Sequence, residues 1–406
     1  MLSITERIQN CSEGAVITLT ADTEEAIVTP KGRSFTLDLG GHTLTAPAGS
    51  CPLHVLGSRV QVRNGRIVAT GATPTIRVGA ADSTEKSYLR LYDDVAVESA
   101  EYAAVFISKG ATLETSADIT VLGGEYAAIS GNGSTNQWGN QATIYGGKIT
   151  APVLGIYWPQ VGDLRIMGGE ITGGTGIEIR AGSLYMQSGT VTGLSAPVSV
   201  TPNGNGSTSQ GAGIAIAQHT TQQTIDVNIN GGIVRGFSAV YESNPQNNPA
   251  DSVEQVSMVI NKGTFETVNG GTKAVYSETQ TGFVKGGTFT SAVDPTLCAD
   301  GFEVLDNGDG TFSSETVSWE YPDNGIAGGG FIGLRRLVMS RRVYTYKAGG
   351  IPIDTDGFDP LAVLCVDVKG GAYGHYDKAS SKVILYRGSK EISGTLENIT
   401  IILLGY

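Results

Sequence analysis

The chain has little charge and few cysteines. Only 16% of its 406 residues are charged and four are cysteine. The cysteines are far apart and form no C-x-x-C pair, which excludes a zinc-ribbon pattern and a dense disulfide framework. A net charge of −12 disfavours binding to DNA or anionic lipid. No apolar run approaches transmembrane length, so we expect neither a nucleic-acid partner nor membrane insertion.

Motifs for metal or nucleophilic chemistry are also missing. None of the four histidines (His42, His54, His219 and His375) belongs to an H-x-x-x-H or H-E-x-x-H spacing, which argues against zinc. Neither a G-x-S-x-G elbow nor a phosphate-binding G-x-x-x-x-G-K-[ST] loop is present. We therefore expect no metal and no cofactor. The start, "MLSITERIQNCSEG", lacks a basic region and an apolar region, so no secretory signal peptide is predicted.

Glycine is abundant, with 57 residues and no collagen period. Much of it recurs in one sequence pattern: "ATIYGGKITA", "DLRIMGGEITGG" and "SLYMQSGTVTG". In each string, alternating apolar residues are followed by a pair of small residues and then by alternating β-branched residues. Period-2 alternation in short segments predicts strands, and a phrase repeated every few tens of residues is typical of a solenoid. We predict a parallel β-helix whose glycine pairs form the bends. Its inward side chains include Ile144, Ile149, Leu164, Ile166 and Ile171.

Two segments carry a resemblance to a known superfamily. "FTLDLGGHTLTA" followed by "SRVQVRNGRIVAT" resembles the right-handed parallel β-helices of the pectate-lyase-like superfamily, over roughly residues 15 to 292. The resemblance implies an all-β, single-stranded right-handed solenoid. It implies less about chemistry, because one fold carries many functions.

The pattern changes along the chain and so predicts domain boundaries. Residues 1–314 read as the β-helix, with a helical N-terminal cap (1–14) over the first coil and a closing hairpin (301–314) around "DNGDGTF". A glycine- and proline-containing linker follows (315–330). Longer strands without the repeat then predict a small antiparallel β-sandwich (331–406), an assembly or anchoring module.

The C-terminal segment "GGAYGHYDKASSKVILYRGSKEISGTLENITIILLGY" is similar to C-terminal modules of tailed-bacteriophage virion proteins. The resemblance implies a bacteriophage virion structural protein, of tail-spike, tail-fibre, head-fibre or decoration type, made in the host cytoplasm and joined to other virion proteins through one terminus. The last strand, "NITIILLGY", is apolar on both faces and needs two covers. We therefore expect a homotrimer associated through this end.

Aromatic residues beside irregular segments predict a site for host-surface polysaccharide. Trp138, Tyr157 and Trp158 lie near amide side chains such as Gln160, and Tyr241 and Glu242 border the polar excursion "ESNPQNNPADSVEQ". Rings of this kind stack on sugars while amides and carboxylates bind hydroxyls. The alternative interpretation is that Trp158 caps a turn and Tyr157 packs in the core.

A polysaccharide depolymerase is the first alternative function, since hydrolysis needs two carboxylates several ångströms apart. Candidate pairs are Asp93 with Asp94, Asp163 with Glu170, and Glu178 with its neighbours. The "NTD", "GHG" and "RIK" signatures of the superfamily's galacturonase-type hydrolases are absent, as is a lyase-type acidic calcium cluster. A bacterial surface adhesin is the second alternative. We predict attachment without cleavage and assign no catalytic residue.

Overall fold

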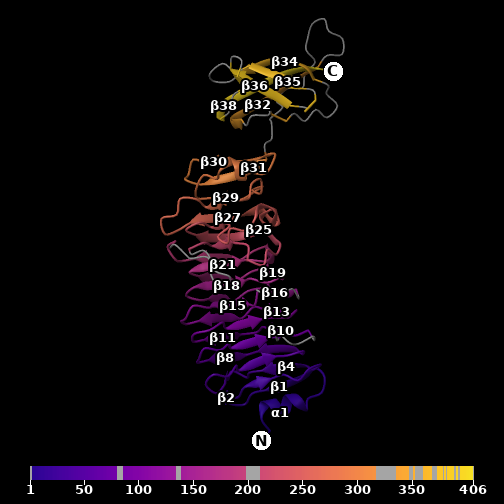
Figure 1. Ribbon diagram of the computed structural model, residues 1–406, viewed down its shortest axis with the longest axis vertical. Helices are drawn as coiled ribbons and strands as arrows, with labels where there is room; N and C mark the ends of the chain where they lie inside the picture. The colour runs from indigo at the N-terminus through magenta and orange to yellow at the C-terminus, as the bar shows by residue number, and fades with distance from the viewer. Residues whose placement is uncertain are drawn as a thin grey trace. The chain divides into compact units, whose positions relative to one another are not determined.

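A computed structural model describes residues 2–79, 86–133, 139–197 and 211–316. Beyond them it describes 335–346, 351–352, 360–367, 373–377, 379–380, 382–387, 390–391 and 394–405. The chain forms two compact units, Met1–Glu315 and Thr316–Tyr406. Among the described residues, nearly all of the regular secondary structure is β-strand (Figure 1). The helices of the described residues are short: α1 (Ile4–Gln9), α2 (Ala250–Val253) and the 3-10 turn η1 (Pro295–Leu297).

Helix α1 lies at the N-terminal end of the first unit, where the sequence predicts a cap. Ser3 and Glu6 form a capping box, each side chain accepting from the other residue's backbone N–H, an arrangement that stabilises the first turn. Ile4 and Ile8 are buried, and the Glu25 carboxylate accepts hydrogen bonds from the N–H groups of Ile4 and Thr5. The helix is thereby fixed to the first coil.

The first unit is built from three ladders of parallel strands, stacked coil upon coil (Figure 1). The first ladder is β1 (Ala15–Thr18), β4 (Ser34–Asp38), β7 (Arg59–Arg63), β10 (Tyr88–Leu91), β13 (Thr112–Thr115), β16 (Asn140–Ile144), β19 (Gly162–Ile166) and β22 (Gly182–Met186). The second is β2 (Thr23–Glu24), β5 (Thr43–Thr45), β8 (Gly65–Ala69), β11 (Val95–Ser99), β14 (Asp118–Val121), β17 (Lys148–Thr150), β20 (Glu170–Gly173) and β23 (Thr190–Gly193). The long strands β25 (Ile225–Gly236) and β27 (Val256–Thr267) continue both ladders.

The third ladder forms a separate parallel sheet. It comprises β3 (Ile27–Val28), β6 (Leu53–Val55), β9 (Ile76–Val78), β12 (Val105–Ile107), β15 (Ala127–Gly131), β18 (Leu154–Trp158), β21 (Thr175–Ile179), β24 (Ile214–Ile216), β26 (Val240–Glu242) and β28 (Val275–Ser277). An all-β unit of large parallel sheets in this order is consistent with the predicted parallel β-helix.

The register brings like residues together in the core. Ile144 pairs with Ile166, and Ile149 with Ile171. All five side chains predicted to point inward, including Leu164, are 0% exposed. The prediction of an inward apolar stack is confirmed, and its burial is the main favourable contribution to folding.

The glycine pairs stand at the bends between the first and second ladders. Gly147 has φ +81°, and a Cβ there would lie 2.1 Å from the Ala117 carbonyl oxygen. Gly169, one coil on, has φ +85°. Left-handed backbone combined with close approach of the neighbouring coil explains why glycine recurs here.

The unit ends with β29 (Thr288–Phe289), β30 (Phe302–Asp306) and β31 (Phe312–Thr316), of which β31 pairs antiparallel with β29. The linker predicted at 315–330 lies outside the described residues, apart from its first two. In the described part of the chain, no helix is long and apolar enough to cross a membrane.

The described residues of the second unit form two antiparallel sheets. One contains β32 (Arg335–Tyr346), β38 (Gly394–Gly405) and β34 (Pro360–Asp367). The other contains β33 (Ile351–Pro352), β36 (Lys382–Arg387), β35 (Tyr373–Asp377) and β37 (Lys390–Glu391). The predicted terminal strand is β38, and it is the central strand of its sheet, between β32 and β34.

Candidate functional site

A pair of tyrosines stands on the third ladder, one coil apart. Tyr241 in β26 is in register with Tyr276 in β28, and their rings stack with centroids 4.9 Å apart and planes at 18°. Both side chains are half-buried. The Lys273 ammonium lies 5.3 Å from the Tyr276 ring centroid. We call Tyr241 and Tyr276 the tyrosine platform, because they form a rigid aromatic surface with polar tips.

A hollow of about 500 Å³ adjoins the platform at Tyr276. Apolar residues form part of its walls, and the polar part carries hydroxyl groups, one amide and charges of both signs: Lys273, Ser277, Glu278, Thr279, Gln280, Thr281, Asp294 and Thr296. Several of these groups are already fixed. Gln280 Nε2 donates to the Val253 carbonyl oxygen at 3.1 Å and to Thr279 Oγ1 at 2.9 Å, and these bonds hold this part of the wall in one conformation.

The buried Glu242 carboxylate accepts hydrogen bonds from residues that line the hollow. Glu242 is 1% exposed. Its Oε2 accepts from Ser277 Oγ at 2.6 Å and from the Glu278 and Thr279 N–H groups at 3.0 and 2.9 Å, and its Oε1 accepts from Thr279 Oγ1 at 2.7 Å. A carboxylate saturated in this way orients residues 277–279 and has no surface to present to a sugar.

The surroundings of Tyr241 favour its neutral form. Burial raises the pKa of Tyr241, and Tyr276 and Glu278 raise it further. The Tyr241 hydroxyl therefore keeps its proton, and its capacity to donate a hydrogen bond, to a higher pH than an isolated tyrosine.

The other residues predicted to bind glycan lie elsewhere. Trp158 is 0% exposed in the central core, and its Nε1 donates to the Gly162 carbonyl oxygen at 3.3 Å. Tyr157 is 9% exposed and packs with Ala127 and Leu154. These two rings offer no open face to a sugar in this structure. Trp138 lies outside the described residues.

Gln160 is fully buried and stands apart from the tyrosine platform. Its amide packs against Gly131, where an added Cβ would lie 1.6 Å from Gln160 Oε1. Neither amide atom has a hydrogen-bond partner among the described residues. Of the predicted residues that the structure describes, Tyr241 and Glu242 belong to the site, Tyr241 at its surface and Glu242 beneath it.

The candidate catalytic carboxylates lie in separate turns and strands of the first unit. Asp93 and Asp94 occupy a left-handed turn after β10, with φ +49° and +56°. Asp163 pairs with Arg165 at 3.2 Å. Glu178 is 0% exposed beside the equally buried Arg180. Among the described residues, no group of three or more His, Cys, Asp or Glu side chains is placed to hold a metal ion.

Tyr276 is the residue of the tyrosine platform that the sequence reasoning missed, although a signal was present. The strings "SAVYES" and "KAVYSE" both contain Ala-Val-Tyr, at 239–241 and 274–276. Equivalent residues of successive coils stack in register. The recurrence therefore predicts that Tyr276 lies directly beside Tyr241.

Comparison with known proteins adds no relative: the chain matches no protein-family model, no curated protein and no solved structure. The fold and the site therefore stand on the geometry described above.

Proposed function

We propose that the chain is a bacteriophage virion structural protein, of spike, fibre or decoration type, that attaches noncovalently to a host-surface polysaccharide. In this proposal the stacked coils are a right-handed β-helix, and the second unit is a β-sandwich that joins three copies and anchors them. The proposal rests on the sequence resemblances and on one structural observation, the tyrosine platform beside its hydroxyl-bearing hollow.

The platform suits a sugar for physical reasons. Tyrosine rings give a large apolar surface that loses little conformational entropy on binding, and their hydroxyls satisfy polar neighbours. A hollow with a few fixed polar groups provides orientation. The combination matches the alternation of apolar C–H faces and hydroxyls on a pyranose ring.

We expect the double substitution Tyr241→Ala/Tyr276→Ala to weaken polysaccharide binding roughly ten- to hundredfold, since each aromatic contact contributes about 0.5–1.5 kcal/mol. Binding of the full chain to a panel of immobilised bacterial surface polysaccharides measures the effect. Tyr145→Ala is the matched control, because Tyr145 is 55% exposed and far from the platform in sequence. Equal binding by the double variant and the wild type would exclude the platform as the contact.

The same samples test the depolymerase alternative. Attachment alone leaves polysaccharide length unchanged, so reducing ends and unsaturated sugar products should not accumulate. Steady release of either product by the wild-type chain would replace attachment with cleavage.

Trimerisation has its own test. We expect light scattering to give a mass about three times 42.2 kDa for the full chain and a monomer mass for a chain truncated after Ser314. The first unit is compact by itself, so the truncated chain keeps its core. A monomeric full-length chain would refute assembly through the second unit.

A further inference from the structure

A second hollow, of about 590 Å³, opens at the turn between the second and third ladders. It follows from a repeated tetrapeptide that the proposed function does not use. Glu-Tyr-Ala-Ala occurs at 101–104 and again at 125–128, after β11 and after β14 respectively. Equivalent positions of neighbouring coils thus carry the same two functional side chains.

The two tyrosines of the repeat contact each other. The Tyr102 and Tyr126 ring centroids are 3.9 Å apart, with the planes inclined at 38°. Burial raises the pKa of Tyr102, and a hydrogen bond to Tyr126 raises it further. Tyr102 is half-buried, whereas Tyr126 remains 44% exposed. Tyr102 therefore supports an outer ring that is open to solvent.

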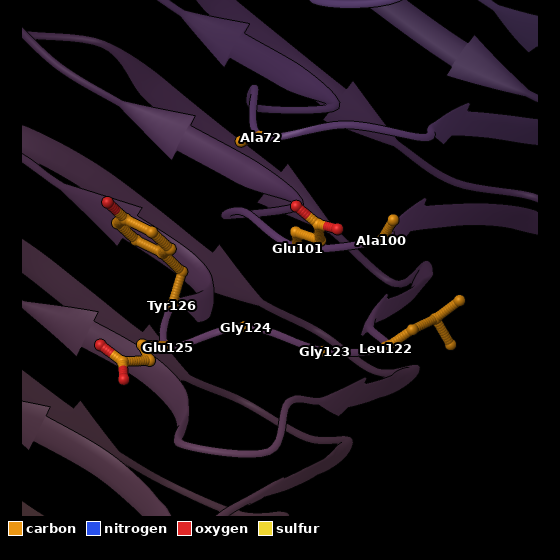
Figure 2. A pocket seen from close by; sticks show the side chains of 8 residues that line it. All are labelled: Ala72, Ala100, Glu101, Leu122, Gly123, Gly124, Glu125 and Tyr126. Carbon is orange, nitrogen blue, oxygen red and sulfur yellow. The ribbon is translucent and has the colours of Figure 1, made fainter.

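The floor of the hollow is bare backbone. Gly123 and Gly124 carry no side chain, and a Cβ on Gly124 (φ +76°) would lie 2.2 Å from the Glu101 carbonyl oxygen. Figure 2 shows the Tyr126 ring and the Glu101 carboxylate projecting to the same side of this glycine segment, while the Glu125 carboxylate points to the other side. An aromatic ring and a carboxylate thus border one open space.

The charge at this hollow is negative. Glu101 and Glu125 are both exposed, and within the described part of the chain no ion pair reaches either carboxylate. Arg77 is the nearby cation: its charge acts on Tyr102, and its guanidinium carbon lies 5.8 Å from the Phe106 ring centroid. Glu101 therefore keeps a carboxylate available beside the Tyr126 ring.

We propose that this hollow binds an organic ammonium group, as carried by an amine-bearing sugar, between the Tyr126 ring and the Glu101 carboxylate. A cation over an aromatic face gains electrostatic attraction to the ring, and a carboxylate on the other side adds a charge-assisted hydrogen bond. The bare glycine floor lets the ligand approach the backbone. The site is separate from the tyrosine platform and does not depend on it.

Calorimetric titration of the full chain with glucosamine oligomers tests the proposal, with N-acetylglucosamine oligomers of equal length as the uncharged comparison. We expect the amine form to bind and the acetylated form to bind at least severalfold more weakly. Glu101→Gln and Tyr126→Ala should each weaken binding of the amine form roughly two- to fivefold. Added salt should weaken it as well, because exposed charges are screened.

Two controls make the result decisive. Glu13→Gln removes the same charge from an exposed position near the N-terminus and should leave the affinity unchanged. The Tyr241→Ala/Tyr276→Ala chain should bind the amine oligomer as the wild type does. The ammonium-site proposal can therefore be refuted while the proposed function stands, and the proposed function can be refuted while the ammonium site stands. Equal effects of Glu101→Gln and Glu13→Gln, or equal affinity for the two oligomers, would overturn the assignment.

Discussion

Replacing Trp158 by alanine should lower the free energy of unfolding by about 3–5 kcal/mol, the range for a large aromatic side chain lost from a core. The indole is 0% exposed, belongs to the central apolar cluster and is in register with Ile179 of the next coil. Its removal leaves a cavity, and the closely stacked coils on either side limit how far that cavity can collapse. The Gly162 carbonyl oxygen also loses its indole donor.

The midpoint of urea unfolding, followed by far-ultraviolet circular dichroism, measures this loss. Tyr145→Ala removes another aromatic ring, but one that is 55% exposed, so its effect should stay within about 0.5 kcal/mol. If Trp158→Ala kept wild-type stability and lost polysaccharide binding, the indole would be a sugar contact, as the sequence first indicated. A stable solenoid that also binds normally would contradict both interpretations.

The architecture of the first unit could be predicted because its signals are local and repeated. Inward side chains such as Ile149 and Ile171 recur with period two, and the bends demand glycine wherever φ is positive and the next coil is close. Each coil repeats the same constraint, so errors in single positions do not alter the prediction. The helical cap predicted at 1–14 is present as α1, and the structure adds the Ser3–Glu6 capping box that closes its first turn.

The candidate site was harder to predict, and Tyr157 and Trp158 show why. Trp158 follows Ile156 by two residues, so alternation alone places it with Ile156 in the core. Tyr157 lies between them, so alternation places its side chain on the outer face, exposed to solvent. It is nevertheless only 9% exposed. Two of its neighbours come from other coils: Ala127 packs against it, and Arg180 Nη1 donates to its hydroxyl at 3.4 Å. Contacts of that kind depend on which other segments cover the outer face of the sheet. The alternating pattern within a single strand carries no information about those segments.

Replacing Glu242 by alanine should destabilise the chain by about 3 kcal/mol or more and also weaken polysaccharide binding, although Glu242 does not reach the surface. The carboxylate accepts four hydrogen bonds from Ser277, Glu278 and Thr279. Alanine leaves those part-buried donors without their acceptor, and each such donor costs about 1–3 kcal/mol unless water enters. Residues 277–279 line the hollow, so their release disorders the binding wall.

Glu242→Gln is the matched control. Its carbonyl oxygen can replace Oε2 and keep three of the four bonds, and its amide can donate to Thr279 Oγ1, which accepts as well as donates. We therefore expect Glu242→Gln to retain most of the stability and most of the affinity that Glu242→Ala loses. Urea unfolding and polysaccharide binding, measured on the same preparations, separate the two possible roles. A carboxylate that touched the glycan directly would lose affinity in both variants with little change in stability. A positioning carboxylate loses stability and affinity together in the alanine variant, because the wall of the hollow and the packing around β26 depend on the same four hydrogen bonds.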